Sequence, residues 1–339
     1  MAQQLESSVA RVSIIDRTTQ VYCHETLDCP SYVFLIENPQ GKRALFDLDL
    51  RKDIESFPPV IRDAMANLQM NANKDVATIL SEDGRVLPSD IGSIIWSHWH
   101  CDHSGDPSTF PPSVDLVVGP GFKDAFLPGY PTNPNGLILE SDYAGRQLQE
   151  IDFTNGPRIG GFRAIDLFGD ESFYLLDAPG NATGHMCGLA RTTPSTFIFM
   201  GADACHHCGS LRPSPHHPLP GTLTPSPFSI PAHQPGTSCR KALLEAIHPK
   251  HSPTQPFYSQ LSEAPGRDVP VAESTIQNMM AFDACEDVLV VLAHDKSLLG
   301  VVDLFPTEVN EWKRKGWKEA GRWRFLRDFT DAACNVSVS

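Results

Sequence analysis

The sequence has few basic residues for its length of 339. Its 27 lysines and arginines are outnumbered by 41 aspartates and glutamates, which gives a net charge of −14. Nucleic-acid binding by charge requires clustered basic side chains, so this balance argues against a nucleic-acid partner. It also argues against a polybasic membrane anchor. We therefore expect a small-molecule substrate, and the sequence leaves the oligomeric state open.

Long apolar runs are also missing. No stretch approaches the roughly 18–20 apolar residues that cross a bilayer, and the first eight residues, MAQQLESS, lack the basic and apolar regions of a signal peptide. The nine cysteines are odd in number and irregularly spaced, which does not predict a disulfide framework. We expect a protein of the reducing cytosol, that is, a cytoplasmic one.

Hydrophobic residues make up 41% of the chain, enough for a sizeable core. Short apolar runs typical of strands alternate with segments of helical spacing, which indicates an α/β fold. The turn Asn38-Pro39-Gln40-Gly41 is of the hairpin type. Strands are predicted at 11–16, 31–37, 44–50, 91–97, 114–118, 162–167, 172–176, 197–201 and 288–293, and helices at 53–71 and 275–285.

Two segments differ from this pattern within a predicted single domain, 1–339. Residues 211–270 contain 13 of the 29 prolines and predict a Pro-rich, irregular insertion or lid, which residues 68–75 would help to close over the site. Phe228, Phe257 and Tyr258 would make this lid apolar. Residues 296–339 predict an aromatic and basic helical extension. Its tryptophans are expected to pack on the body, in preference to a partner-binding role: Trp312, Trp317 and Trp323.

The strongest chemical signal is an H-x-H-x-D-H motif directly after an apolar run: residues 97–106 read SHWHCDHSGD. Residues two apart on an extended strand share a side, so His98 and His100 can reach one metal ion. Asp102 and His103 lie in the following turn and can reach a neighbouring position. Imidazole and carboxylate ligands suit Zn²⁺, with iron or manganese as alternatives.

This motif resembles the signature of the metallo-β-lactamase superfamily, whose fold is an αββα sandwich with a dinuclear metal site at one edge. Three later segments match the family pattern in order: DAPGNATGH ending at His185, FIFMGAD ending at Asp203, and VLVVLAH ending at His294. The resemblance covers residues from about 30 to 295, the expected core. It implies two metal sites that share Asp203: one of His98, His100 and His185, the other of Asp102, His103 and His294.

The resemblance implies a hydrolase with two zinc ions per chain. Two such ions clamp a shared water and lower its pKa toward about 7, so that a bridging hydroxide attacks a carbonyl carbon. Asp102 and Asp203 are the residues expected closest to this chemistry. An aspartate rather than a cysteine at position 203 is similar to the lactonase and glyoxalase II branches and unlike the common zinc β-lactamases.

A lactonase-like member would open a small lactone, lactam or cyclic carbamate, which in some fungal relatives serves detoxification. The alternative is a thioesterase of the glyoxalase II or polyketide type. A nuclease is disfavoured by charge, and oxygen reduction would require iron and a flavin domain. Thioesters of coenzyme A bring phosphates, and basic residues are rare around the motifs: 98–110 and 177–190 contain none, and 201–239 contain only Arg212. The cyclic substrate is therefore favoured.

The run Cys205-His-His-Cys208 provides only two thiolates, and no second pair follows it. We therefore expect His206 and His207 to line the pocket entrance instead of forming a second zinc site. Cys101 and Cys187 are expected to pack as small apolar residues.

Overall fold

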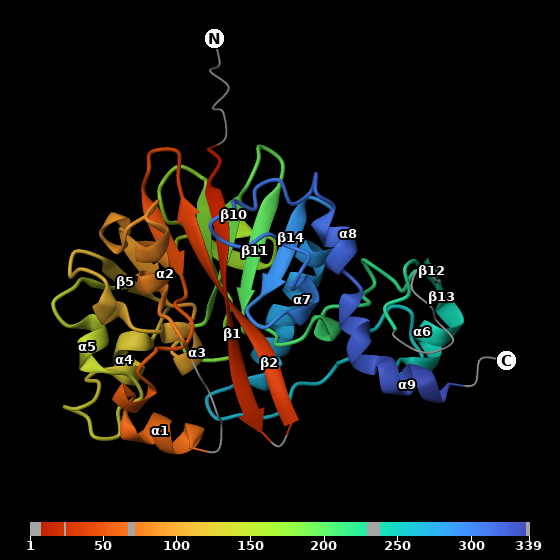
Figure 1. Ribbon diagram of the computed structural model, residues 1–339, viewed down its shortest axis with the longest axis horizontal. Coiled ribbons are helices and arrows are strands. Elements are labelled where there is room, and N and C mark those ends of the chain that lie inside the picture. The colour runs from red at the N-terminus through yellow and green to blue at the C-terminus, as the bar shows by residue number, and fades with distance from the viewer. Residues whose placement is uncertain (1–7, 24, 67–71, 229–237, 337–339) are drawn as a thin grey trace, which may run out of the picture.

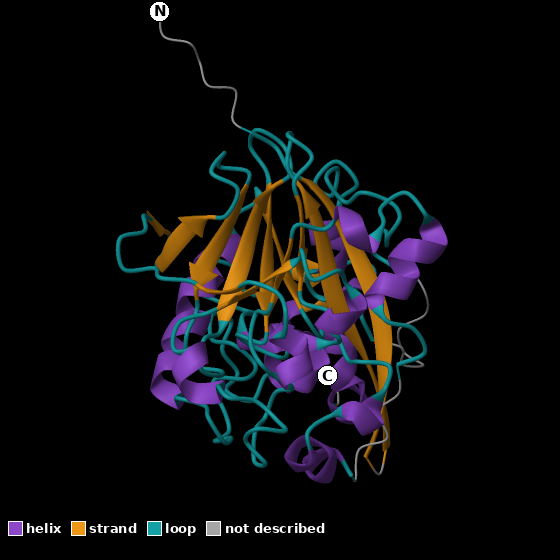
Figure 2. Cartoon of the chain, turned by 90° about the vertical axis from the view of Figure 1, so that its left-hand side faces the viewer, coloured by secondary structure: helices purple, strands orange, loops and turns teal. Residues whose placement is uncertain are grey.

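The computed structural model consists of two facing six-stranded sheets with helices on their outer sides (Figures 1 and 2). The structure describes residues 8–23, 25–66, 72–228 and 238–336, without the side chains of residues 17–29. In the described part of the chain, no helix combines the length and apolar character needed to span a membrane.

The first sheet follows chain order. A long antiparallel hairpin pairs with a third antiparallel strand, and the remaining strands run parallel. Its strands are β1 (Arg11–Cys23), β2 (Glu25–Glu37), β3 (Arg43–Phe46), β4 (Ser93–Ile95), β5 (Asp115–Val118) and β6 (Leu148–Glu150).

The second sheet is antiparallel except where β14 pairs parallel with β11. In spatial order its strands are β14 (Val288–Leu292), β11 (Phe197–Ala202), β10 (Met186–Arg191), β9 (Phe173–Asp177), β8 (Phe162–Asp166) and β7 (Arg158–Ile159). A short separate ladder is made by β12 (Thr222–Leu223) and β13 (Cys239–Arg240).

The helices divide between the two outer sides (Figure 1). The first sheet is covered by helices that include α2 and α4, whereas α7 packs on the second sheet. The helices are α1 (Pro59–Met65), α2 (Val76–Asp83), α3 (Cys101–Ser104), α4 (Phe122–Phe126), α5 (Glu140–Tyr143), α6 (Lys241–Ile247), α7 (Val269–Ala284), α8 (Trp317–Gly321) and α9 (Thr330–Asn335).

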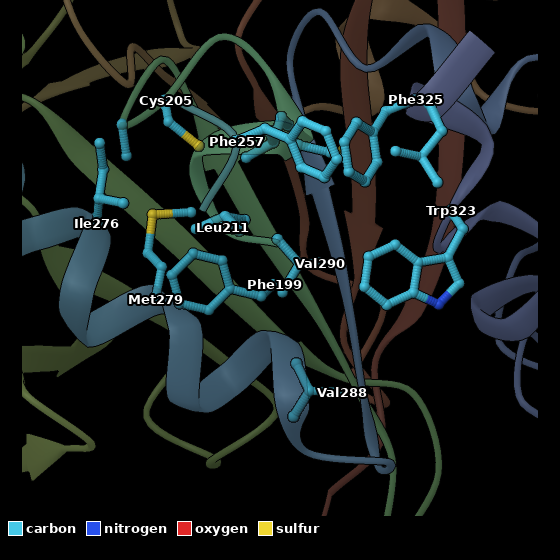
Figure 3. Packing of buried hydrophobic residues seen from close by; sticks show 14 of the residues in the cluster. Phe199, Cys205, Leu211, Phe257, Ile276, Met279, Val288, Val290, Trp323 and Phe325 are labelled. Carbon is cyan, nitrogen blue, oxygen red and sulfur yellow. The ribbon is translucent and has the colours of Figure 1, made fainter. Parts of the chain in front are cut away.

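Alternation along the strands explains why the apolar runs are continuous. In β14, Val288 and Val290 face α7, whereas Leu289 and Val291 face the first sheet. Figure 3 shows Val288 and Val290 on the side where α7 presents its apolar residues. Successive side chains of a strand point to opposite faces, so a strand buried on both faces needs apolar residues at every position. The predicted αββα sandwich is confirmed.

Several predicted element boundaries are wrong. The strand predicted at 44–50 ends at Phe46, because Asp47 and Asp49 adopt positive φ angles of 66° and 60°. The helix predicted at 53–71 is a 3₁₀ turn (Ile54–Ser56) followed by α1. The chain is extended at Pro58, as expected for a residue that precedes proline. The rest of that prediction, residues 67–71, lies outside the described residues. Strand β10 was not predicted.

The segment 211–270 is less irregular than predicted, since it contains α6, β12 and β13. Its described part is also integrated into the core. A single hydrophobic cluster joins it to the outer side of the second sheet through Leu211, Leu219, Phe228, Leu244 and Phe257.

The C-terminal extension packs on the body through tryptophans that are all buried, as predicted: Trp312, Trp317 and Trp323. It is not one helix but a series of short ones: a 3₁₀ turn (Lys296–Leu298), α8, a 3₁₀ helix (Arg324–Phe329) and α9. Hydrophobic clusters therefore include residues on both sides of the range 30–295, among them Val12 and Trp312.

Candidate metal centre

The predicted ligands come together at one edge of the sandwich, where loops of both sheets meet. His98 and α3 follow β4, His185 precedes β10, Asp203 follows β11, and His294 follows β14. Backbone hydrogen bonds join these loops: Met186 N–H donates to the Ser97 carbonyl (2.8 Å) and Ala293 N–H to the Ala202 carbonyl (3.1 Å). Residues distant in the sequence are thus held by the ends of rigid strands.

Six of the seven predicted ligands fall into two groups, each with its ligand atoms within 4.8 Å of one another: His98, His100 and Asp203, and Asp102, His103 and His294. Asp203 lies between the groups. Its Oδ2 is 3.6 Å from Nε2 of His98, and its Oδ1 is 3.3 Å from Nε2 of His103 and 3.2 Å from Nε2 of His294. The carboxylate therefore reaches both groups, as a bridging ligand must.

His185 belongs to neither of these compact groups, although the sequence predicts it as a ligand of the first. Its ring centroid lies 5.1 Å from that of His98. The side chain is 1% exposed, and its Nε2 lacks a hydrogen-bond partner. His185 is thus beside the first group with a nitrogen available.

Most of these histidines are held by their Nδ1 atoms. Nδ1 of His98 contacts Ser97 Oγ at 3.0 Å. Nδ1 of His185 lies 2.8 Å from the Ala178 carbonyl, and that of His294 lies 2.9 Å from the Pro30 carbonyl. A ring that donates from Nδ1 to a carbonyl keeps Nε2 unprotonated, which is the tautomer that binds a metal.

The site also contains buried polar atoms that lack a hydrogen-bond partner: Nε2 of His98, His103 and His185 and Oδ1 of Asp203. Such an atom costs about 1–3 kcal/mol when it remains unsatisfied. Nitrogen and carboxylate donors of this kind suit zinc. The residues therefore fit a metal centre.

Asp47 is a site residue that the sequence analysis missed. Its Oδ2 lies 2.8 Å from Nδ1 of His103, and its two oxygens accept hydrogen bonds from the backbone N–H and the hydroxyl of Ser97. A carboxylate behind a ligand histidine orients the ring and makes it more basic. The available signal was the acidic pattern Phe46-Asp47-Leu48-Asp49 at the end of an apolar run, which was interpreted as part of a strand.

Backbone strain accompanies Asp203. The preceding residue, Ala202, has a φ of 42°, in the left-handed region, and the register between β11 and β14 shifts there. A non-glycine residue in that region costs about 1–3 kcal/mol. The bend directs the chain out of β11 so that the Asp203 carboxylate, 3% exposed, enters the cluster of histidines.

Burial and nearby carboxylates shift the pKa values of the site histidines in opposite directions. Burial lowers the pKa of His98 and lowers the pKa of His185 to about 4, so both rings are neutral at pH 7. Burial also opposes a charge on His294, but the carboxylates of Asp203 and Asp102 outweigh it and raise the pKa of His294 to about 9. The second group thus attracts positive charge, which a metal ion would supply in place of a proton.

A cavity of about 500 Å³ opens beside the second group, a size typical of small-molecule sites. His206 and His207 line it, as predicted, and Nε2 of His206 lies 3.1 Å from Asp203 Oδ2. The full lining is Asp102, His206, His207, Cys208, His294, Asp295, Lys296, Ser297, Arg324, Phe325, Arg327 and Asp328.

This lining contradicts the expectation that the site would be poor in basic residues. Lys296, Arg324 and Arg327 come from the C-terminal extension, which folds back over the cavity. Counting lysines and arginines near the motifs failed because the two arginines lie about thirty residues beyond the last motif and because Lys296, two residues after His294, fell outside the counted ranges.

The predicted lid is not found at this cavity either. None of the described residues of 211–270 lines it, and neither do residues 72–75, while 68–71 lie outside the described residues. Phe228 and Phe257 are buried in the hydrophobic cluster, and Tyr258 packs edge-on against His207 with ring centroids 4.8 Å apart.

Cys101 and Cys187 pack among apolar residues as predicted, half-buried and buried respectively. In the described chain no candidate metal group includes Cys205 or Cys208, and Cys208 Sγ donates to Asp295 Oδ2 at 3.1 Å. Cys187 is buried, and burial raises the pKa of Cys101 as well as that of Cys187, so both thiols remain protonated.

Comparison with known proteins places these features in context. No protein-family model matches the chain. Gamma-lactamase FDB1 of Fusarium pseudograminearum (strain CS3096) is 45% identical over 318 residues, which cover 90% of this chain and 76% of the relative. Metallo-hydrolase mfmC of Annulohypoxylon moriforme is 42% identical over 314 residues, with 90% and 80% covered.

A solved structure shares the fold. N-acyl homoserine lactone hydrolase, with the product N-hexanoyl-L-homoserine bound at its catalytic metal centre, matches with a TM-score of 0.56 at 16% sequence identity. The match covers 89% of this chain and 99% of that one.

Proposed function

Because this chain belongs to the lactonase-like branch of the metallo-β-lactamase superfamily and is a metal-dependent hydrolase, we propose that it opens a small cyclic ester or amide: a lactone, a lactam or a cyclic carbamate. The observation that carries this proposal is the set of unpartnered Nε2 atoms and the shared Asp203 carboxylate beside a cavity of about 500 Å³. The relative named gamma-lactamase supports the ring substrate.

We assign two zinc ions to this centre. His98, His100 and His185 would hold one, and a second set would hold the other: Asp102, His103 and His294. Asp203 would be shared. When bound, the ions would lower the pKa of a water molecule and polarise the carbonyl of the ring. The chain itself supplies the preorganisation, because Nδ1 contacts fix four of the five ligand histidines, all but His100, before a metal arrives.

Asp102 connects the metal centre to the cavity. Its side chain is 27% exposed, lines the cavity, and has Oδ2 3.5 Å from Nε2 of His294. A ring in the cavity would therefore meet the second group first. Since ring opening keeps the leaving group tethered, the product would be a single acid that also bears a hydroxyl or an amine.

The preference for a ring over a thioester rests on the relatives. The argument that the site has too few basic residues for a coenzyme A thioester no longer holds, because basic residues line the cavity. We also propose a cytoplasmic location, which is consistent with the free thiols of the seven cysteines whose side chains the structure describes.

Metal analysis combined with a hydrolysis panel tests this function. We expect close to two zinc ions per chain, and hydrolysis of at least one lactone, lactam or cyclic carbamate that disappears on chelation and returns with zinc. A metal-free protein that still hydrolyses its substrate would contradict the proposal.

A further inference from the structure

The cavity beside the metal centre is lined by several basic side chains, although the protein as a whole is acidic. Its wall carries the side chains of Lys296, Arg324 and Arg327, although the whole chain has a net charge of −14. Asp102 belongs to the second ligand group, which leaves Asp295 and Asp328 as the carboxylates that could neutralise this wall.

Both of those carboxylates accept hydrogen bonds from groups other than the three cations. Asp295 accepts hydrogen bonds from Ser297 N–H (2.8 Å) and from the thiol of Cys208 (3.1 Å). Asp328 Oδ2 lies 3.0 Å from Nε2 of His207, whose Nδ1 accepts from Gly209 N–H. Because Nδ1 is an acceptor, Nε2 carries the proton and donates it to Asp328.

The cations, by contrast, have no ionic partner in the described part of the chain. No carboxylate oxygen there lies within the 4.0 Å ion-pair distance of the side-chain nitrogens of Lys296, Arg324 or Arg327. Nε of Arg324 is buried and has no hydrogen-bond partner. A buried guanidinium N–H without an acceptor is costly, so an acceptor from outside the chain would be stabilising.

Local geometry places the two arginines together. They lie three residues apart in the 3₁₀ helix Arg324–Phe329, and side chains at i and i+3 of such a helix eclipse one another. Burial and the neighbouring Arg327 guanidinium lower the pKa of Arg324, and the Asp295 carboxylate, although beyond ion-pair distance, opposes this shift. The two guanidinium groups therefore repel each other, and Asp295 offsets only part of this repulsion.

The 3₁₀ helix that carries the two arginines is packed against the body of the protein through Phe325. Figure 3 shows Phe325, which lies between the arginines in the sequence, beside Phe257 and Trp323. Its ring centroid is 5.7 Å from that of Phe257 and 6.1 Å from that of Trp323. The contact between His207 and Asp328 fixes the other end of the helix. A preorganised surface loses less entropy on binding than a flexible one.

We infer that Arg324 and Arg327 bind a carboxylate that the substrate carries outside the ring that is opened. This inference rests on the proposed function and specifies its substrate class: a small lactone, lactam or cyclic carbamate with an additional acidic group. The anion would enter the cavity with its ring toward Asp102 and His294 and its carboxylate toward the two guanidinium groups. A guanidinium suits this role because its fork of N–H donors matches a carboxylate.

A matched pair of substrates tests the inference: a γ-lactone with a 3-carboxylate and the same lactone with a 3-carboxamide. The two have nearly equal size and differ in charge. For the zinc-loaded wild-type protein we expect kcat/KM to be at least about tenfold higher for the carboxylate, mostly through a lower KM, since a charged hydrogen bond is worth about a factor of ten. The preference should weaken as ionic strength rises.

Arginine variants locate the effect. Arg324→Met and Arg327→Met keep the approximate length of the side chain and remove its charge, and the double variant should lose the preference for the carboxylate, so that kcat/KM for the carboxylate falls to about that for the carboxamide. Arg314→Met is the matched control, because Arg314 is exposed, pairs with Glu311 and does not line the cavity. The thermal midpoint of each variant verifies folding.

A binding measurement separates this inference from the proposed function. Cyclopentanone-3-carboxylate and its carboxamide have no ring bond to hydrolyse, and calorimetry on the zinc-loaded proteins should show tighter binding of the carboxylate to wild type than to the double variant. If no ring is hydrolysed but this difference in binding appears, the proposed ring-opening function is wrong and the inferred carboxylate site is supported. Equal binding of the carboxylate to both proteins would assign it to the metal ions and overturn the inference, as would arginine-dependent turnover confined to coenzyme A thioesters.

Discussion

Asp47 and His103 form a buried carboxylate–imidazole pair, with Asp47 Oδ2 2.8 Å from His103 Nδ1, at the junction of the first sheet and the metal centre. Both side chains are almost fully buried, and Nε2 of His103 faces Asp203 Oδ1 at 3.3 Å. The pair therefore links the end of β3 to the carboxylate that both ligand groups share. It determines which nitrogen of His103 is available to a metal.

Asp47→Asn should weaken metal binding without disturbing the backbone. Asparagine tolerates the positive φ of this position. Its carbonyl oxygen must accept from Ser97 N–H, which places the amide NH₂ opposite His103 Nδ1 and forces the proton onto Nε2. We expect zinc affinity to fall about 10–100-fold, as measured by competition with a chelator. The exposed Asp53 provides the control Asp53→Asn, for which affinity should be unchanged.

Asp203→Ala should remove at least one metal ion and lower the rate by at least about 10²-fold, because even residues that only orient ligands are worth about 10–100-fold. Metal content and kcat/KM are the measurements. Asp287→Ala is the control, since Asp287 is half-exposed at the opposite end of β14 and pairs with Lys313. Turnover by Asp203→Ala near that of wild type would make Asp203 merely a strand-end residue.

Gly119→Ala should destabilise the protein and displace His185. A Cβ at position 119 would lie 1.9 Å from the carbonyl oxygen of Gly184, the residue before His185. Forcing an extra carbon into a packed site costs about 1–3 kcal/mol. We expect a lower thermal midpoint and weaker zinc binding. Gly221→Ala has open space around the new Cβ and should leave both properties as in wild type.

Lys318 should make stability depend on pH above neutrality. Its buried Nζ donates to the carbonyls of Cys285 and Val288, and burial lowers its pKa to about 8. A lysine whose folded pKa lies below its unfolded value destabilises at low pH, and this penalty is relieved as pH rises from about 8 to 10.5. Wild type should therefore gain about 2 kcal/mol of unfolding free energy between pH 7.5 and 9.5 relative to Lys318→Met.

Urea unfolding at the two pH values measures this gain. Only the difference between the pH values is compared, because Lys318→Met also leaves two carbonyls unsatisfied at every pH. The control is Lys313→Met, which removes a half-exposed lysine from the same extension and should retain the wild-type dependence.

Small rings should be better substrates than coenzyme A thioesters. The cavity of about 500 Å³ can enclose a substituted five- or six-membered ring, whereas the nucleotide and pantetheine arm of coenzyme A would have to remain outside. We expect kcat/KM for at least one ring to exceed that for simple acyl-coenzyme A thioesters by at least tenfold, a gap of about 1.4 kcal/mol. Robust thioester turnover without activity on any ring would favour the alternative function.

Much of the centre could be predicted from the sequence because its signals are local. The spacing of His98, His100, Asp102 and His103 after a buried strand is a property of about ten consecutive residues. Asp203 and His294 each end an apolar run, and strand ends in a sandwich meet at an edge. The same alternation of apolar residues that builds β11 and β14 therefore predicts where these side chains lie.

Only the tertiary structure shows which residues hydrogen-bond to the ligand histidines and which residues line the cavity beside them. Asp47 was hidden in what looked like a strand, because the positive φ that turns its carboxylate toward His103 depends on contacts with Ser97, fifty residues away. The arginines of the cavity wall lie more than a hundred residues from any motif except that of His294. Short-range periodicity determines where strands form and how the ligands within a motif are spaced. Which residues contact a buried charged side chain depends instead on how distant segments of the chain pack, and no local sequence pattern predicts that packing.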